Sequence, residues 1–344
     1  MTVTIKDIAK HAGVSHTTVS RALNGNPTIS DRTASNIREI ALSLGYLPSA
    51  AARGLKTRHS GVIGVLVSRI DNPYFGEIIQ GVEDTIKGTG YSAFVSSSYL
   101  DPLHEKNTIQ AFSEHRVDGV IIGSVPVQRK NISLLNSYGI PVVVINNQSS
   151  WNQKYSISHD DSYGAYQVTQ HLLELGHQKI AYLGNARANN INNSRLNGFQ
   201  AALRDARLEA VSSLINNLDG GEIENGVLGM RTMLNRGEDF TAIFCFNDLV
   251  AIGAMHVLQE SGISVPGDVS VVGFDNIPYS AFSNPPLTTF DQPKHSIGAA
   301  AAGMLMDLIN ASSDSGNHSK SITKLIRGQL LIRKSTSPVQ RRRN

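Results

Sequence analysis

Cysteine is nearly absent from this chain of 344 residues, which has only Cys245. A single cysteine excludes a disulfide or a cluster of thiolate ligands within one chain, and the apolar neighbours of Cys245 predict a packed core thiol. The sequence also has no apolar stretch of membrane-spanning length and no cleavable signal ahead of its first helix pattern. We therefore expect a cytoplasmic protein.

The motifs of several enzyme classes are missing as well. The sequence has no phosphate-binding loop ending in Gly-Lys-Ser/Thr, no Gly-x-Ser-x-Gly turn and no His-Glu-x-x-His helix. His171 and His177 flank Gly176 at the end of a helix pattern, where capping or surface roles suit them better than metal ligation. We expect no metal, no cofactor and no enzymatic activity.

Two short helix patterns joined at a glycine are present at residues 4–24. Thr4 and Asp7 predict a capping box for the first helix, Gly13 the turn, and Ser15 the cap of the second helix. This layout is a helix-turn-helix, whose second helix presents its early side chains to DNA bases. A small amphipathic helix pair without a ligand is the alternative. The candidate DNA contacts here are Thr4, Ser15, His16, Thr17, Ser20, Arg21 and Asn24.

A third helix pattern and the charge distribution support DNA binding. Ser30 is an N-cap candidate, apolar residues recur at helical spacing from Ile37 to Leu44, and Gly45 marks the end. Residues 1–60 contain eight Lys or Arg against three Asp or Glu, whereas residues 61–344 contain 23 against 25. A basic head on a slightly acidic body is typical of phosphate binding.

The segment after the head brings the chain close to a known family. Pro48 ends the third helix, Ser49 is a cap for a further short one, and Gly54 makes that helix marginal alone. Here the chain resembles the lactose repressor family of bacterial transcription regulators over nearly its whole length. The resemblance implies a hinge helix that orders on operator DNA, with Leu55 as a wedge in the minor groove beside Arg53 and Lys56. A plain linker is the alternative.

From residue 61 apolar strand patterns alternate with helix patterns, as in a doubly wound α/β architecture. The body is long enough for two lobes. The resemblance implies lobes like those of periplasmic sugar-binding proteins, with the chain crossing between them near residues 160–163, 290–293 and 322–324. The expected domains are an all-α helix-turn-helix head (1–47), a hinge helix and linker (48–60) and a two-lobed body (61–344). The body is expected to be periplasmic-binding-protein-like α/β, with doubly wound parallel sheets. Its N-lobe should comprise about 61–161 and 293–322, and its C-lobe about 162–292 and 323–336.

Polar residues follow several predicted strands, at the sheet edge where α/β proteins bind ligands. Carboxylates and amides there match the hydroxyls of a sugar, although Asp and Asn at strand ends also cap the following helices. These residues are Asp71, Asn72, Tyr74, Ser124, Asn146, Asn147, Asn247, Asp248, Asp275 and Asn276.

The family resemblance narrows the candidates for the effector site. It implies that Asp275 and Arg195 grip the effector, that Tyr74, Asn247 and Gln292 occupy pocket positions, and that Asp160 is a weaker match. Asn72, Ser124 and Asn189 complete the predicted effector-binding set.

Two departures from the family pattern limit what the resemblance implies. The purine-binding repressor of this family has an arginine at the position of Asn189, which argues here against a purine. Other members place an aromatic ring over the ligand where this chain has Gly221. Trp151, Tyr74 or Tyr99 could replace that ring, or the pocket could be enlarged for a longer saccharide.

Residues 330–336 resemble the closing strand of the family, and no leucine heptad follows them, so we expect a dimer. The basic residues 341–343 could contact nucleic acid, although a short disordered tail is the simpler interpretation.

The sequence predicts a dimeric repressor of a palindromic operator, controlled by a small molecule, most simply a saccharide. The alternatives are a receptor whose head binds a protein and an α/β enzyme acting on a sugar. Steep salt dependence of DNA binding, or sugar turnover, would discriminate between them.

Overall fold

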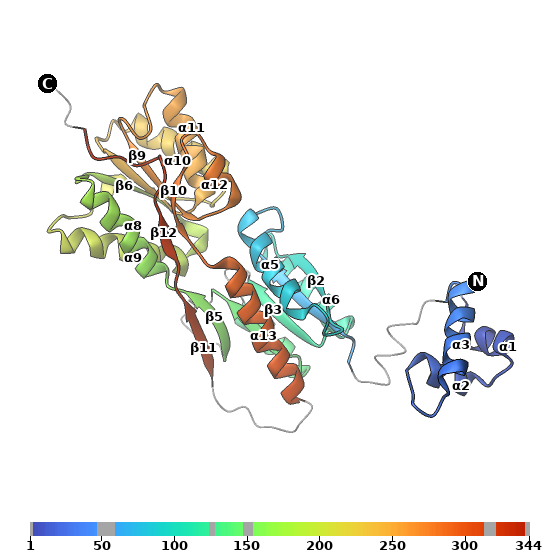
Figure 1. Cartoon of the computed structure of the whole chain (residues 1–344). Coiled ribbons are helices and arrows are strands. Elements are labelled where there is room, and N and C mark those ends of the chain that lie inside the picture. The colour runs from blue at the N-terminus through green and yellow to red at the C-terminus, as the bar shows by residue number, and fades with distance from the viewer. Residues whose placement is uncertain (1–2, 47–58, 124–127, 147–153, 313–320, 341–344) are drawn as a thin grey trace. The chain divides into compact units, whose positions relative to one another are not determined.

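The computed structural model describes residues 3–46, 59–123, 128–146, 154–312 and 321–340, in two compact units, Met1–Ser60 and Gly61–Asn344 (Figure 1). The predicted hinge residues Arg53, Leu55 and Lys56 lie outside the described residues, as do Ser124, Asn147 and Trp151.

The first unit consists of three helices, α1 (Ile5–Ala12), α2 (His16–Leu23) and α3 (Asp31–Ser43). The Asp7 carboxylate accepts hydrogen bonds from the backbone N and Oγ1 of Thr4 at 2.8 and 2.7 Å, which starts α1. Gly13 ends α1 with a φ of 65° that disfavours other residues. Small and branched apolar side chains from all three helices fill the core, which confirms a three-helix head. The buried core residues are Ile8, Ala9, Val19, Ala22, Ala34, Ile37 and Ala41.

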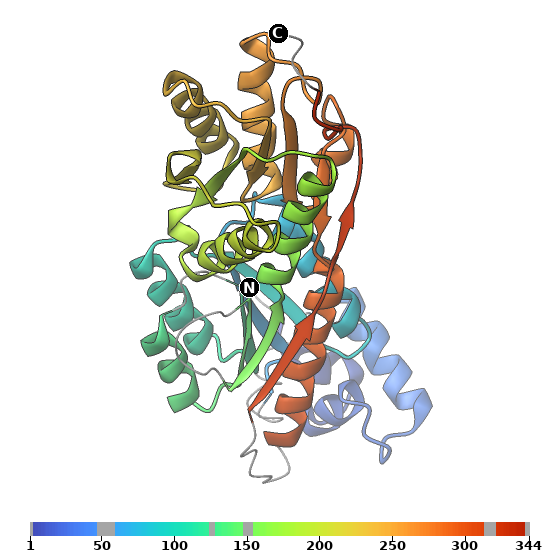
Figure 2. The ribbon, with the colours of Figure 1, turned by 90° about the vertical axis from the view of Figure 1, so that its left-hand side faces the viewer.

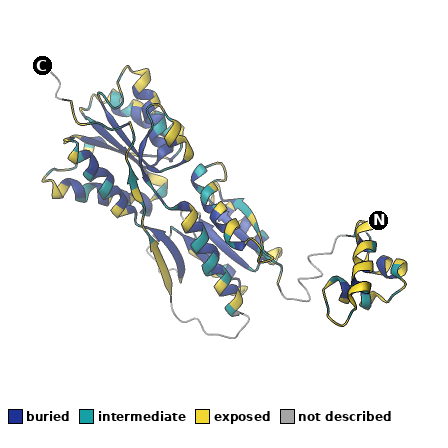
Figure 3. Ribbon diagram, in the orientation of Figure 1, coloured by how far each residue is buried: buried dark blue, intermediate teal, exposed yellow. Residues whose placement is uncertain are grey.

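The first lobe of the second unit is a six-stranded parallel sheet in the order β11-β5-β4-β3-β1-β2. Helices α5 (Pro73–Ile86) and α13 (Lys294–Ser312) cover one face, and α6 (Pro102–Glu114) and α7 (Arg129–Ser137) cover the other. Because both faces are covered, the inner strands β1, β3 and β4 are rich in β-branched residues and almost fully buried, whereas the edge strand β11 is largely exposed (Figure 3). The strands are β1 (Val62–Val67), β2 (Ser92–Ser97), β3 (Gly119–Gly123), β4 (Val142–Ile145), β5 (Tyr155–His159) and β11 (Ile322–Ile326).

The second lobe repeats this design in the order β12-β10-β9-β8-β6-β7, with β12 antiparallel to β10. Helices α8 (Asp161–Glu174) and α9 (Asn190–Asp205) cover one face, and α10 (Ile223–Asn235) and α11 (Asp248–Glu260) cover the other. Cys245 is fully buried in β8, which confirms a packed core thiol. The remaining elements are β6 (Ile180–Asn185), β7 (Ile215–Leu218), β8 (Ala242–Cys245), β9 (Ser270–Asp275), β10 (Thr288–Asp291), β12 (Gln329–Leu331), helix α12 (Pro278–Phe282) and the short 3-10 helices Ala186–Ala188 and Ser212–Leu214.

Glycines bring the helix pair of the first lobe into close contact. A Cβ atom added at Gly81 of α5 would lie 2.1 Å from the His295 carbonyl oxygen, and one at Gly298 of α13 would lie 1.9 Å from that of Ile78. Both positions therefore require glycine, and α5 and α13 pack against each other (Figure 1).

The chain passes between the lobes after β5, after β10 and between β11 and β12. The expected third crossing near residues 322–324 lies too early, because Ile322–Ile326 pairs with Tyr155–His159 in the first lobe. The crossing falls instead at Arg327 and Gly328, between two strands that run in one line from lobe to lobe (Figure 2).

His171 and His177 are not surface residues, contrary to expectation. His177 is buried, with Nδ1 at 2.9 Å from Thr241 Oγ1 and Nε2 at 3.0 Å from the Ser337 carbonyl oxygen. His171 Nε2 lies 3.1 Å from Thr336 Oγ1. The two rings anchor the segment that follows β12.

Among the helices that the structure describes, none is long and apolar enough to cross a membrane.

Candidate functional site

Helix α2 presents a polar face at its N-terminal end. Ser15 Oγ accepts a hydrogen bond from the backbone N of Thr18 at 3.1 Å, so the helix begins where predicted. Val19 and Ala22 are buried, whereas His16, Thr17 and Arg21 are exposed. An exposed helix N-terminus with an imidazole and a guanidinium suits contact with phosphates and base edges.

The other candidate DNA contacts of the head also lie on its surface but have structural partners. Thr4 is held by Asp7, and Asn24 Nδ2 donates to the Ser20 carbonyl oxygen at 2.6 Å. Ser20 is partly buried. These side chains therefore shape the ends of α1 and α2, while the exposed residues of α2 remain open to a ligand.

A cavity of about 790 Å³, including its solvent-open part, lies between the two lobes, and we call it the interlobe cavity. Six of the predicted effector residues line it: Asn72, Tyr74, Arg195, Asn247, Asp275 and Gln292. The other lining residues are Ser68, Arg69, Phe75, Leu100, Gly123, Asn146, Asn185, Arg187, Ala188, Ile191, Gly221, Glu222 and Phe246.

Arg195 is a buried cation that lines this cavity. Its Nε donates to Asp161 Oδ1 at 2.8 Å, Nη1 donates to the Phe246 carbonyl oxygen, and Nη2 lies 3.7 Å from Asp275 Oδ1. The guanidinium carbon lies 4.4 Å from the ring centre of Phe246 and 3.9 Å from that of Phe274. Burial alone would raise the pKa of Asp161, but the charge of Arg195 brings that pKa below its ordinary value. The ion pair thus holds the guanidinium in one orientation.

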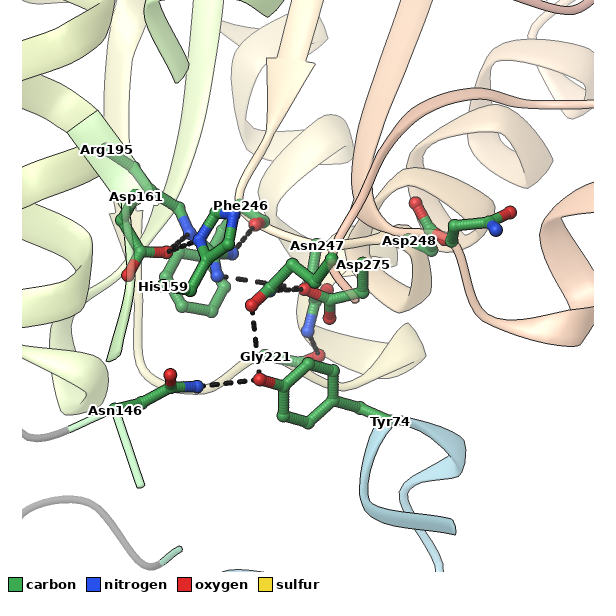
Figure 4. A network of polar contacts seen from close by, with 12 residues as sticks. Tyr74, Asn146, His159, Asp161, Arg195, Gly221, Phe246, Asn247, Asp248 and Asp275 are labelled. Carbon is green, nitrogen blue, oxygen red and sulfur yellow. Dashed lines mark hydrogen bonds and ion pairs between the residues drawn. The ribbon is translucent and has the colours of Figure 1, made fainter. Parts of the chain in front are cut away.

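Asp275 is a buried carboxylate that faces the same cavity. Burial raises its pKa to about 6, although Arg195 and Lys294 oppose the shift. Gln292 Nε2 donates to Asp275 Oδ1 at 2.6 Å, and the Tyr74 hydroxyl donates to Gln292 Oε1 at 3.1 Å. Asn146 Nδ2 in turn donates to the Tyr74 hydroxyl at 2.6 Å (Figure 4). A chain of hydrogen bonds therefore joins the first lobe to the carboxylate of the second.

The side-chain amides of Asn185 and Asn247 lie next to Gly221. A Cβ atom at Gly221 would lie 2.8 Å from Asn185 Nδ2 and 3.1 Å from Asn247 Nδ2, and Asn247 Nδ2 donates to the Gly221 carbonyl oxygen at 2.9 Å. Of the suggested substitutes Tyr74 lines the cavity, whereas Tyr99 is exposed, packs on His104 and is not among the lining residues.

The apolar wall of the cavity includes Phe75, Leu100, Ile191 and Phe246, none of which was singled out from the sequence. Phe246 directly precedes Asn247 at a predicted strand end, and this position in the sequence could have identified it.

Two described residues of the predicted effector-binding set do not line the cavity. Asp160 caps α8 by accepting from the backbone N of Tyr163 at 3.0 Å, and its carboxylate pairs with Arg327 at 3.2 Å. Asn189 is exposed, with a φ of 36°, at the turn into α9. Arg187 lines the cavity instead, with its guanidinium held by Asp219 at 2.7 and 2.8 Å. The cavity therefore has an arginine at its rim, although position 189 is not an arginine.

Two family models match the chain. Residues 4–49 match the model described as bacterial regulatory proteins of the lacI family, and residues 60–329 match periplasmic binding proteins and the sugar binding domain of the LacI family.

Individual proteins resemble the chain over nearly its full length. The HTH-type transcriptional repressor PurR of Haemophilus influenzae (strain PittEE) is 36% identical over 98% of this chain and 99% of its own. A lac repressor dimer bound to operator and the anti-inducer ONPF is 27% identical, with a TM-score of 0.85 over 98% and 100% of the two chains. The transcriptional regulator CelR in complex with cellobiose is 27% identical, with a TM-score of 0.74 over 97% and 99%.

Proposed function

Because this chain belongs to the lacI family of bacterial regulatory proteins and is a DNA-binding transcriptional repressor rather than an enzyme, we propose that a saccharide in the interlobe cavity sets its affinity for operator DNA. The observation that carries the proposal is the convergence of a buried carboxylate, Asp275, and a buried guanidinium, Arg195, on one cavity. The protein then acts in the cytoplasm as a homodimer on a palindromic operator.

The chemistry of the cavity suits a neutral polyhydroxyl compound. A sugar hydroxyl both donates and accepts, so it matches the Asp275 acceptor, the Arg195 donor and the amides of Asn247 and Gln292. Phe246 and Ile191 supply apolar surface for the C–H face of a sugar ring. The family model of the body and the cellobiose complex of CelR support this ligand class.

A purine is the competing candidate. Arg187 at the cavity supplies an arginine near the position where the purine-binding repressor of the family has one. Its guanidinium is already paired with Asp219, so a purine would have to compete with that carboxylate. Because this ion pair is exposed, breaking it costs little, and the preference for a saccharide comes from the groups of the cavity that match hydroxyls.

The effector would change DNA affinity by favouring one relative arrangement of the two lobes. The hydrogen-bond chain Asn146–Tyr74–Gln292–Asp275 spans both lobes, so a ligand held by Asp275 and Tyr74 prefers one arrangement of them. If only that arrangement, or only the other, lets the predicted hinge segment with Leu55 order on DNA, ligand and operator affinities are coupled reciprocally.

A thermal-shift screen of the full chain tests the ligand class. The panel contains ribose, glucose, cellobiose, hypoxanthine, guanine and adenosine. We expect a saccharide to raise the melting temperature of the wild type and not that of Arg195→Met or Asp275→Ala, while both variants still bind operator DNA. Stabilisation by a purine alone would replace the saccharide proposal and leave the repressor function intact.

A further inference from the structure

Lys294 is a fully buried cation to which the sequence analysis gave no role. Its side chain is 1% exposed, and it is the first residue of α13, directly after the second crossing between the lobes. A buried ammonium must be paired to offset its loss of water. Its Nζ donates to the Asp275, Asn276 and Gln292 carbonyl oxygens at 2.6, 3.1 and 3.3 Å, and it lies 3.4 Å from Asp291 Oδ1 and 3.5 Å from Glu77 Oε1.

Two of these partners have an unfavourable backbone conformation. Asp275 has a φ of 113° and Asn276 a φ of 53°, consecutive positive values in residues other than glycine. Such a backbone persists only where its surroundings hold it. Because both carbonyl oxygens accept from one ammonium, Lys294 fixes the turn that directs the Asp275 carboxylate into the interlobe cavity.

The same ammonium belongs to the first lobe. Helix α13 packs on α5, and Glu77 of α5 approaches Nζ from that side with a side chain that is 43% exposed. Lys294 therefore reaches from the first lobe into the turn of the second lobe that carries the effector carboxylate.

We propose that Lys294 is a positioning residue that holds the Asp275–Asn276 turn and ties it to Glu77 of the first lobe. A ligand that contacts Asp275 thereby acts on a turn whose geometry depends on the arrangement of both lobes. The inference rests on the proposed effector role of Asp275 and adds the element that links this site to α5.

Amide hydrogen exchange of the full chain without effector tests the proposal. The backbone N of Asn276 donates to Thr289 Oγ1 and that of Ile277 donates to Asp248 Oδ2, so both amides are protected reporters of the turn. We expect Lys294→Met, which keeps the length and removes the charge, to speed exchange at residues 276–277 about tenfold. Exchange in β8 and α11 should not change.

A change on the first lobe gives the sharper test. Glu77→Gln should speed exchange at residues 276–277 about two- to threefold, because Lys294 loses part of its counter-charge. Glu83→Gln, an exposed residue of the same helix with the same charge change, is the control and should have no effect.

Two results would overturn the inference. One is an even rise in exchange over the whole second lobe in Lys294→Met, which indicates packing alone, and the other is no change at residues 276–277 in Glu77→Gln. Because no effector is present, these results are independent of whether a saccharide is the ligand.

Discussion

At the residue scale, the charged side chains of Arg195 and Asp275 in the interlobe cavity are buried and held in place by neighbouring residues. Arg195 lies between two aromatic rings and two carboxylates, so its direction is fixed before any ligand binds. Asp275 is held by Gln292 and by the backbone contacts of Lys294. Such preorganisation lowers the entropic cost of binding a hydroxylated ligand.

The ionisation of Asp275 predicts a pH dependence of effector binding. Its pKa is about 6, and only the carboxylate form accepts two hydroxyl donors, so affinity should fall about tenfold per pH unit below 6. Titration calorimetry at several pH values with the stabilising compound measures this. Asp275→Asn should bind weakly at every pH, and a wild-type affinity that stays constant from pH 5 to about 7 would contradict the assignment.

Asp248 predicts a pH dependence of stability. Burial and the nearby charge of Asp275 raise its pKa to about 8, although Thr289 Oγ1 and the Ile277 backbone N donate to it. Because this pKa lies above the unfolded value of 3.8, the stability it contributes is complete at low pH and is lost as pH rises through 8.

The free energy of unfolding should therefore fall by about 2 kcal/mol between about pH 6.5 and 8.5, a window above the pKa of Asp275. Urea denaturation measures this fall. Asp248→Asn should flatten the profile, and equal slopes in wild type and variant would contradict the role of Asp248.

At the scale of elements, helix ends and helix contacts decide what each segment can do. Helix α2 begins at Ser15 and turns its apolar side inward, so its exposed residues are set by helical periodicity. Helices α5 and α13 meet through glycines, so the segment after the second crossing lies directly on the first lobe. The first element is a candidate reader of DNA and the second carries Lys294.

The recognition helix predicts a specific loss in Arg21→Ala. A guanidinium forms a bidentate pair with guanine, so the variant should lose roughly 1–3 kcal/mol on the operator and relax preference at one base pair. Gel shifts with operator and random DNA measure both effects. An equal loss on both DNAs would mean that Arg21 contacts only phosphate.

The α5–α13 contact predicts a contrast between two glycines of one helix. Gly298→Ala should destabilise the body by about 1–3 kcal/mol or more, because the new Cβ would lie 1.9 Å from the Ile78 carbonyl oxygen. Gly303→Ala, with nothing within 4 Å of its Cβ position, should gain about 0.5–1 kcal/mol from reduced backbone entropy. Chemical denaturation compares them, and similar effects would disprove the close contact.

At the scale of the whole molecule, two units carry different charges and different tasks. The first 60 residues are strongly basic and fold around their own small core, while the body is slightly acidic and contains the cavity. In the proposed function, DNA affinity and effector affinity therefore reside in separate units. Any control of one by the other requires a connection through the chain between them.

The oligomeric state predicts the form of the operator. A homodimer presents two recognition helices related by two-fold symmetry, so its operator should be an inverted repeat. Sedimentation at micromolar concentration should give dimers, and operator affinity should fall steeply with salt as counterions are released. A stable tetramer, or a shallow salt slope, would contradict this assembly.

The sequence by itself determined features that depend on neighbouring residues. The caps at Thr4, Ser15 and Ser30 and the glycine turn at Gly13 follow from local hydrogen bonding, and the buried strands β1, β3, β4 and β8 follow from continuous apolar runs. Polar residues after such runs also located five of the lining residues, because parallel strands end at one edge of a sheet: Asn72, Tyr74, Asn146, Asn247 and Asp275.

Only the tertiary structure decided features that depend on distant segments. Strands β5, β7, β10 and β11 contain polar residues that break the apolar pattern, and pairing with neighbours makes them strands. Arg187 rather than Asn189 lines the cavity, and Lys294 gains its role from carbonyl oxygens of another lobe. Local sequence records the type of a side chain, whereas its burial and partners arise when remote elements pack together.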